Sequence, residues 1–416
     1  MNSRRAFLGQ VASGIGGLAI PHVVLGANDR VRFGIIGFGA RGQEIARDAL
    51  SCVNTEFTAI SDIYGGHREK AKAIAPSIKT FVDYRLMLEE KDLDAVLIST
   101  PPHLHAEHFV ASLEAGKHVY QEKIMAFSLN HAKRMRTAYE ATKGRQVVQI
   151  GHQACSSGHV ADAQSWISAG KLGQITAINT SMYRNTPHGK PQWSRYIKPD
   201  MTPENIAWNQ FLGEAPQVPF DANRFQNWRL FWDYSGGNVH ENMCQQAAFW
   251  YKVLGLKIPQ AVTMTGGLFR WKDGREVPDT MNVSMVQSEQ ILFSWSSGFG
   301  NASPGMAEQV LGSDGTIVRA LQIKYLPEKV NRADLEPIIG QAQTKRSAHM
   351  QNFIEAIRES KEVNCSFDLG FRVSIACAMA VESFRRGSTV RWDRINQEFI
   401  QTVVEADTAS ITALVD

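Results

Sequence analysis

Three glycines, Gly37, Gly39 and Gly42, are spaced as Gly-x-Gly-x-x-Gly directly after the apolar run Val31 to Ile36. The first suits a tight turn, the second lets the backbone approach a pyrophosphate, and the third allows close packing of a helix on a strand. Asp62 lies twenty residues beyond Gly42, at the end of a second apolar run. There a carboxylate can accept hydrogen bonds from an adenosine ribose. The pattern predicts a dinucleotide-binding unit built as strand, turn, helix and strand.

The cofactor of this unit is predicted to be NAD. A carboxylate at Asp62 would repel the 2′-phosphate of NADP, although the neighbouring Tyr64, His67 and Arg68 leave NADP open. The turn residues Phe38, Ala40 and Arg41 complete the predicted phosphate site, because a helix N-terminus offers N–H donors to an anion. The competing interpretation is a structural βαβ unit whose turn binds nothing.

The elements that position this turn alternate in type up to about residue 150. The β-branched run Leu93 to Thr100 predicts a buried parallel strand, and the loop containing Thr100, Pro101 and His105 should lie over the cofactor. A short strand, 117–120, leads to Glu122 and Lys123. Alternation of this kind predicts an N-terminal Rossmann domain, a doubly wound parallel sheet spanning 28–151.

The pattern changes after His152. From Ile175 the sequence alternates as strands do, with few intervening helices, which predicts a second domain, 152–395, with a large open and mainly antiparallel sheet. Residues 396–416 are predicted to form a C-terminal tail. The segment 185–227 interrupts the strands and is rich in aromatic and polar residues. It could be a lid or a sugar-stacking wall, or a surface excursion with a small core of its own.

Composition excludes several classes of protein. The 416 residues contain 44 basic and 41 acidic side chains, and setting aside Arg4 and Arg5 leaves 42 against 41. No basic field remains to attract nucleic acid or an anionic membrane surface. The five cysteines show no metal-binding spacing and no close pair, so we expect buried thiols and no metal site.

The first 27 residues resemble a bacterial Tat signal, with the twin arginine Arg4-Arg5 followed by Phe7-Leu8 and a mild apolar stretch. The stretch is too short and too rich in glycine for a good membrane span, so we expect no integral span in the mature chain. We predict export to the periplasm, with membrane anchoring if the signal is retained. Because that compartment holds little free NAD, a tightly held cofactor is expected. The alternative is an ordinary basic N-terminus before an amphipathic helix.

From Val31 to about Asp393 the chain resembles the Gfo/Idh/MocA oxidoreductases. The resemblance rests on the glycine turn, the Thr100-Pro101-Pro102 loop with His105, the Glu122-Lys123 pair and three further segments, 169–173, 312–316 and 349–353. It implies a Rossmann domain followed by an open antiparallel sheet that carries the substrate site. It also implies a homo-oligomer, a dimer or a tetramer.

The family's Glu-Lys-Pro motif stands here as Glu122-Lys123-Ile124. The resemblance implies that Lys123 lies beside the substrate hydroxyl and that Glu122 belongs to the cofactor site. An ammonium in that position can hydrogen-bond a sugar oxygen, stabilise alkoxide character and share in acid–base work. The missing proline changes the backbone preference at Lys123.

A second family site departs from its pattern. Aligned on Gly236-Gly237 and on Leu254-Gly255, Glu241 falls where the family has an aspartate, and Gln245 falls where it has the usual catalytic histidine. Glutamine can orient a hydroxyl but cannot accept its proton. The base role is therefore assigned to His240 or Glu241, with Lys123 as partner; a capping or packing role for His240 stays open.

The leading functional hypothesis is NAD(P)-dependent oxidation or reduction of a secondary hydroxyl on a sugar, glycoside or cyclitol. The predicted substrate contacts are Lys123, His152, Tyr183, His188, Trp193, Trp232 and His240, with the aromatic rings stacking on the sugar. Two alternatives remain: a redox-neutral glycoside hydrolase with captive NAD, and a sugar-binding protein without activity.

Overall fold

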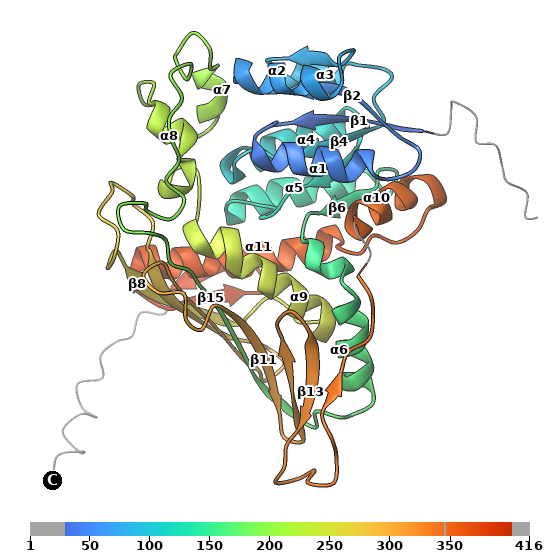
Figure 1. Ribbon diagram of the computed structural model, residues 1–416, viewed down its shortest axis with the longest axis vertical. Helices are drawn as coiled ribbons and strands as arrows, with labels where there is room; N and C mark the ends of the chain where they lie inside the picture. Colours follow the sequence, from blue (N-terminus) through green and yellow to red (C-terminus); the bar gives the residue numbers. More distant parts are fainter. Residues whose placement is uncertain (1–29, 345–346, 402–416) are drawn as a thin grey trace, which may run out of the picture. The chain divides into compact units, whose positions relative to one another are not determined.

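The N-terminal part folds as a six-stranded parallel sheet in the order β3-β2-β1-β4-β5-β6, in a computed structural model that describes residues 30–344 and 347–401 (Figure 1). Its strands are β1 (Val31–Ile36), β2 (Thr55–Ser61), β3 (Lys79–Phe81), β4 (Ala95–Ile98), β5 (His118–Gln121) and β6 (Val148–Ile150). The strand order reverses between β1 and β4, where open α/β sheets bind their ligands. The predicted doubly wound sheet is confirmed.

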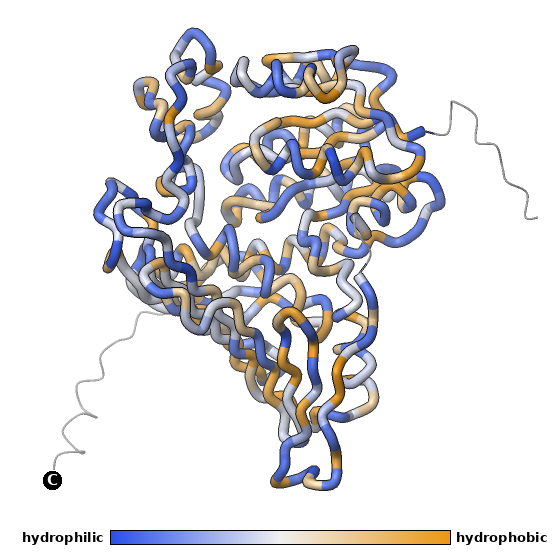
Figure 2. Tube along the Cα trace, in the orientation of Figure 1, coloured by the Kyte–Doolittle hydropathy of each residue, from blue (hydrophilic) through white to orange (hydrophobic). Residues whose placement is uncertain are grey.

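Helices cover this sheet because each presents an apolar stripe to it. They are α1 (Ala40–Leu50), α2 (Gly65–Ile74), α3 (Tyr84–Leu88), α4 (His105–Glu114) and α5 (Leu129–Ala141). One more comes from far along the chain: α10 (Ala348–Glu359) packs on α1 and β1 and places Met350, Phe353 and Ile354 in the core of the N-terminal sheet. Figure 2 shows orange, apolar stretches along the strands of this layer.

The second sheet has ten strands in the order β14-β13-β12-β11-β7-β10-β9-β8-β15-β16. They are β7 (Ile175–Tyr183), β8 (Ala261–Gly267), β9 (Thr280–Val286), β10 (Leu292–Gly298), β11 (Met306–Gly312), β12 (Gly315–Arg319), β13 (Ile323–Pro327), β14 (Ile338–Ile339), β15 (Val390–Asp393) and β16 (Glu398–Gln401). Only β7 and β10 pair in parallel among the described strands of this sheet. The predicted antiparallel architecture is confirmed, and β16 lies in the segment predicted as a tail.

One face of the second sheet is buried and the other is exposed. Along β9, Met281 and Val283 are buried, whereas Asn282 and Ser284 are exposed, as the two-residue period of a strand requires. The buried face packs against α6 (Gly158–Ser168), α9 (Cys244–Leu254) and α11 (Phe367–Arg386). Figure 1 shows α9 and α11 lying between the two sheets. The N-terminal end of α9 is thereby held below the first sheet.

The five cysteines are buried free thiols, as their spacing predicts. Within the described ranges, none of the helices has the length and apolar character needed to cross a membrane. The predicted Tat signal, residues 1–27, lies outside the described residues.

Candidate active site

The glycine turn has the geometry that its sequence predicts. Gly37 has a φ of +87°, and a Cβ on Gly42 would lie 2.2 Å from the carbonyl oxygen of Gly37. Any side chain at Gly42 would therefore separate α1 from β1. A Cβ on Gly39 would meet only His67, at 3.7 Å, so the backbone of Gly39 is open to a ligand. The N–H groups of the first turn of α1 lack helical partners and suit a pyrophosphate.

Asp62 closes the opposite side of the turn. Its Oδ2 accepts a hydrogen bond from the Phe38 N–H at 2.6 Å and lies 3.0 Å from Nδ1 of His67, and its Oδ1 accepts from the Tyr64 N–H at 2.8 Å. Burial raises the pKa of Asp62, but the charge of His67 and these hydrogen bonds outweigh burial, so the net shift is downward. Asp62 is thus an anion at neutral pH. A carboxylate has about four acceptor sites, which leaves one for a ribose hydroxyl.

A cleft of about 840 Å³ runs from the glycine turn across the carboxyl ends of the strands, within the size range of cofactor sites. Gly37, Gly39, Asp62, Thr100 and Pro101 line one side. The other side comes from the insertion and the residues directly after it: Arg195, Asn209, Gln210, Phe211, Gly213, Glu214, Phe225, Gln226, Trp228 and Arg229. This segment, 185–227, which we call the strap, carries α7 (Trp208–Leu212) and α8 (Ala222–Gln226). It is a wall of the cleft that also has a small apolar core.

The strap is attached to the N-terminal domain on the Asp62 side of the cleft. The Tyr64 hydroxyl donates to the carboxylate of Asp200. Backbone hydrogen bonds run from the Ala207 N–H to the carbonyl of Ile63 and from the Gly65 N–H to the carbonyl of Asn205, each 3.1 Å long. These bonds join the strap to the segment that follows β2.

A second attachment lies on the far side of the cleft. Nε2 of His103, in the loop after β4, is 2.7 Å from the carbonyl oxygen of Phe211. The carboxylate of Glu214 accepts two hydrogen bonds of 2.7 Å from Arg134 and lies 3.6 Å from Nε2 of His131. The strap therefore spans the cleft from one edge to the other, and Figure 1 shows α7 and α8 beside the N-terminal sheet.

Of the predicted cofactor residues in the loop after β4, Thr100 and Pro101 line the cleft and His105 does not. The ring of His105 is fully buried, with Nδ1 2.7 Å from the carbonyl oxygen of Ile124 and Nε2 2.8 Å from that of Thr100. Burial lowers the pKa of His105, against the effect of the two carbonyls. The side chain joins the cofactor loop to the segment that carries Lys123, so any contribution to cofactor binding is indirect.

Glu122 supports the glycine turn through Arg41. Its buried Oε1 lies 2.7 Å from Nη2 of Arg41, which also contacts Glu44 at 3.0 Å through Nη1. Burial lowers the pKa of Arg41, but the charge of Glu122 outweighs it and the net shift is upward. Arg41 lines the cleft, so Glu122 acts by holding this cation beside the phosphate-binding turn.

Lys123 and Glu241 meet although 118 positions separate them in the sequence. Nζ of Lys123 donates to the Glu241 carbonyl oxygen at 3.0 Å and to its Oε2 at 3.1 Å. Nε of Arg229 lies 3.1 Å from the same Oε2. Glu241 belongs to a π-helical turn, Val239–Met243, at the start of α9, a conformation frequent at functional sites. Because Arg229 also lines the cleft, the Lys123–Glu241 pair lies next to the cofactor site. The peptide bond from Lys123 to Ile124 is cis.

Neither predicted base is a good proton acceptor at neutral pH. Burial raises the pKa of Glu241, but Arg229 and Lys123 outweigh it and bring it to about 2. Burial lowers the pKa of His240 to about 4, and its Nδ1 already accepts the Gly236 N–H at 2.9 Å. The proton of His240 therefore sits on Nε2. The ring packs edge-on against Phe127, so the geometry favours the packing role that the sequence leaves open.

Gln245, at the family's histidine position, contacts His152. Its Oε1 lies 3.4 Å from Nδ1 of His152, so the imidazole donates and Nε2 is left with a lone pair. Burial, together with the charge of Lys123, lowers the pKa of His152 to about 3. The predicted substrate residue His152 and the predicted catalytic residue Gln245 are thus brought together beside Lys123.

None of the predicted substrate contacts is among the residues that line the cleft, neither Lys123, His152 and His240 nor the four that remain. Trp193 packs edge-on against Phe299, and the ring of Tyr183 lies against the neighbouring Gly298. Trp232 packs on Phe384 of α11. His188 is exposed, 3.3 Å from Arg270. Their roles toward a substrate stay predictions.

Sequence reasoning missed the arginines of the site. Arg229 contacts Glu241 directly, Arg184 reaches the next residue, Asn242, at 3.0 Å, and Arg195 lines the cleft with Arg229. Each arginine belongs to no motif, and only the fold brings them to Glu241. The aromatic and polar composition of the strap was the one available signal.

The glycine cradle, the anionic Asp62 and the long cleft fit a nicotinamide dinucleotide and define a dinucleotide-dependent oxidoreductase. Residues 31–152 match the model of the oxidoreductase family with an NAD-binding Rossmann fold, Gfo/Idh/MocA. The match covers the N-terminal domain, and a nicotinamide dinucleotide is the cofactor that this domain binds.

Individual relatives agree with this assignment. The levoglucosan dehydrogenase of Pseudarthrobacter phenanthrenivorans is 25% identical over 360 residues, which are 74% of this chain and 82% of that protein. The inositol 2-dehydrogenase of Salmonella typhimurium is 29% identical over 155 residues, 37% of this chain and 46% of that protein, so this match spans less than half of the relative.

Two solved structures share the fold. A levoglucosan dehydrogenase in complex with NADH and levoglucosan superposes with a TM-score of 0.66 at 19% identity, over 87% of this chain and 99% of that chain. The aldose–aldose oxidoreductase of Caulobacter crescentus gives 0.66 at 18% identity over the same shares. These identities support the fold alone.

Proposed function

We propose that this protein interconverts a secondary alcohol and a ketone on a sugar, glycoside or cyclitol, with NAD as the preferred cofactor. The observation that carries the proposal is the Lys123–Glu241 ion pair at the carboxyl end of β5, beside the dinucleotide cleft. The names of the relatives, levoglucosan dehydrogenase and inositol 2-dehydrogenase, support this class of substrate. When bound, the nicotinamide supplies the hydride acceptor or donor.

The residues of the chain supply the proton chemistry. In the direction of carbonyl reduction, the ammonium of Lys123 hydrogen-bonds the oxygen that gains negative charge and gives it a proton. In oxidation the same nitrogen, in its neutral form, takes the hydroxyl proton. Glu241 holds the nitrogen in place through two contacts, and its low pKa keeps it an anion throughout. Gln245 and His152 orient the hydroxyl.

We further propose that the cofactor is tightly held, because the strap spans the cleft and is attached at both edges. Release then requires at least one attachment to open. Export through the Tat-type signal at residues 1–27, to the periplasm, is part of the same proposal: a retained cofactor would cross with the folded protein. N-terminal sequencing of the secreted chain tests the signal.

A homo-oligomer is also proposed, formed through the exposed face of the second sheet. Val286, Leu292 and Met306 are each more than 40% exposed on its strands, and apolar side chains on an open sheet favour a partner. Light scattering measures the state directly; a monomer at micromolar concentration would contradict this proposal.

The proposed activity is tested with the purified protein and a panel of sugars, glycosides and cyclitols. Formation of NADH that stays in proportion to the substrate supports a dehydrogenase. A transient NADH signal accompanied by release of free sugar would instead support the redox-neutral hydrolase. No signal despite bound cofactor would refute both.

A further inference from the structure

Four basic side chains gather around the single carboxylate of Glu241. Lys123 and Arg229 contact it directly, each with a nitrogen 3.1 Å from Oε2. Arg184 donates to Oδ1 of Asn242, the next residue, at 3.0 Å. Arg195 lines the cleft with Arg229 and experiences the charges of Arg229, Glu241 and Glu44. We call Lys123, Arg184, Arg195 and Arg229 the cationic rim.

Glu241 is the one carboxylate in direct contact with the basic groups of the rim among the described residues. Four cations face one carboxylate, a surplus of three. The adjoining network of Arg41, Glu44 and Glu122 contributes one cation and two carboxylates, so the surplus for these eight side chains is two. The carboxylates of Asp62 and Glu214 line other parts of the cleft. His152 and His240 add no charge at neutral pH, because burial lowers the pKa of the first to about 3 and of the second to about 4.

The rim is also poorly hydrated where it meets Glu241. The side chains of Lys123 and Arg229 are 15% and 21% exposed. Taking several cations partly out of water is costly unless anions compensate them. Arg195 has no carboxylate within ion-pair distance among the described residues, yet burial is the main influence on its pKa and lowers it. A guanidinium in this state is a ready donor to a planar or tetrahedral anion.

We propose that the substrate is an anionic sugar, bearing a carboxylate or a phosphate group, and that Arg195 and Arg229 bind that group while Lys123 meets the reacting hydroxyl. This inference rests on the proposed function, because it names the substrate class of the same site. Sugar acids and sugar phosphates share the chemistry that the rim recognises. A positive cleft also raises the local concentration of an anion and its rate of association.

One other anion could satisfy the rim: the pyrophosphate of the cofactor. The glycine turn already offers the N-terminus of α1 and the side chain of Arg41 to that group. Arg229 is tied instead to Glu241, the partner of Lys123, on the substrate side. We therefore assign the anionic group to the substrate, and the test separates the two sources.

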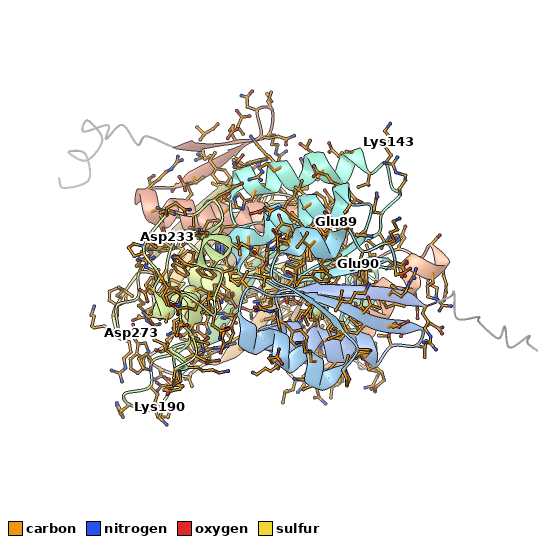
Figure 3. The ribbon with its side chains drawn as sticks, turned by 90° about the horizontal axis from the view of Figure 1, so that it is seen from above. Glu89, Glu90, Lys143, Lys190, Asp233 and Asp273 are labelled. Atoms are coloured by element: carbon orange, nitrogen blue, oxygen red, sulfur yellow. The ribbon has the colours of Figure 1, made fainter. Side chains whose placement is uncertain are left out.

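The test compares glucuronate, galacturonate, gluconate and glucose 6-phosphate with glucose and galactose, on the full-length protein loaded with NADH. Binding is read from protection against thermal unfolding, which needs no turnover, and reduction of NAD is followed in separate samples that are loaded with NAD instead of NADH. Arg195→Gln and Arg229→Gln remove one cation each. The matched control is Lys190→Gln, which removes the same charge from an exposed side chain of the strap that points away from the body of the molecule (Figure 3).

We expect at least one acid to bind roughly tenfold more tightly than its neutral counterpart, and each rim variant to lower that preference about tenfold. Lys190→Gln should leave it unchanged, and the affinity for NADH should change less than about twofold in all three variants. Added salt should weaken binding of the acid selectively.

Equal binding of acidic and neutral sugars, or no protection by any acid at about 10 mM, would overturn the inference. So would rim variants that lose NADH affinity together with the acid, because the rim would then hold the pyrophosphate. Selective acid binding without NAD reduction would leave the inference standing and refute the proposed function instead.

Discussion

The ammonium nitrogen of Lys123 lies 3.1 Å from Oε2 of Glu241 and 3.0 Å from its carbonyl oxygen. Lys123 follows β5 of the first sheet, and Glu241 lies in the turn that leads into α9, the helix packed on the buried face of the second sheet. The proton donor of the site is therefore aligned only when the two halves of the fold are docked. This relationship links the architecture to the chemistry.

Replacing Lys123 with methionine should lower kcat by about 10²- to 10⁴-fold, because the developing charge on the substrate oxygen loses its only ammonium donor. Binding of NADH, titrated by its fluorescence, should change little. Lys123→Arg keeps the charge and should retain part of the activity. Activity of Lys123→Met within tenfold of the parent would show that another group handles the proton.

The rate of oxidation should show no bend from Glu241 or His240 between about pH 5 and pH 8, since their pKa values are about 2 and about 4. Glu241→Gln should lower the rate without changing the shape of the pH profile. A bend in that range that disappears in Glu241→Gln would contradict the assignment of this carboxylate as a permanent anion. Kinetics across the range, at saturating cofactor, provide the check.

Asp62 should set the choice of cofactor. Asp62→Ser removes the charge that repels a 2′-phosphate, so the ratio of NADP to NAD efficiency should rise by about tenfold or more. The melting temperature should also fall, because the N–H groups of Phe38 and Tyr64 lose their acceptor. Asp92→Ser, on an exposed surface carboxylate, is the control. If the ratio of NADP to NAD efficiency stayed the same in Asp62→Ser, Asp62 would not be the residue that sets the preference for NAD.

The strap should control release of the cofactor. Tyr64→Phe removes the hydroxyl that bonds Asp200, and the dissociation rate of NADH should rise by about tenfold or more, the value of one hydrogen bond to a charged group. Tyr196→Phe makes the same change at an exposed tyrosine of the strap and should have no effect. Stopped-flow displacement measures both dissociation rates. Equal rates for the two variants would show that the attachment of the strap at Tyr64 does not control release of the cofactor.

Buried neutral histidines should make the fold sensitive to acid. Burial lowers the pKa of His103, His108 and His152 to about 3 and of His349 to about 4. Because these folded pKa values lie below the unfolded value of 6.5, the stabilising contribution of the neutral histidines is complete above about pH 6.5 and is lost as the pH falls from there toward about 3. Each histidine contributes up to about 1.4 kcal/mol per pH unit to that slope.

Calorimetry of the parent and of His108→Asn between about pH 4 and pH 7.5 tests this expectation. The free energy of unfolding of the variant should fall less steeply with decreasing pH, and the difference in slope should correspond to about one proton. His188→Asn, at an exposed histidine, should follow the parent curve. A parent protein whose melting temperature stayed level from pH 7 to pH 4 would refute the argument.

The sequence was sufficient for the parts of the site that are local. The turn from Gly37 to Gly42, the acid at Asp62 and the loop at Thr100 depend on neighbours within one βαβ unit, so spacing predicts their positions. The parallel and antiparallel architectures of the two sheets can be predicted from the spacing of apolar residues along the sequence, without knowledge of tertiary contacts.

The parts that sequence reasoning could not place depend on distant contacts. Arg229 and Arg184 carry no spacing signal and become site residues only because α9 and β7 converge on Glu241. His240 was predicted as a base from its residue type, but its Nδ1 accepts a hydrogen bond from the Gly236 N–H. This hydrogen bond cannot be predicted from the sequence. Likewise, α10 joins the core of the first sheet from 200 positions beyond β6.

The most direct measurement follows the near-ultraviolet absorbance of NADH when the full-length protein meets NAD and a panel of neutral and acidic sugars, in parallel with Lys123→Met at equal cofactor occupancy. The account predicts a stable rise with at least one secondary alcohol in the parent and almost none in the variant. Equal rises in both proteins, or none in the parent while its cofactor remains bound, would contradict the assignment of Lys123 and Glu241 as the reacting centre.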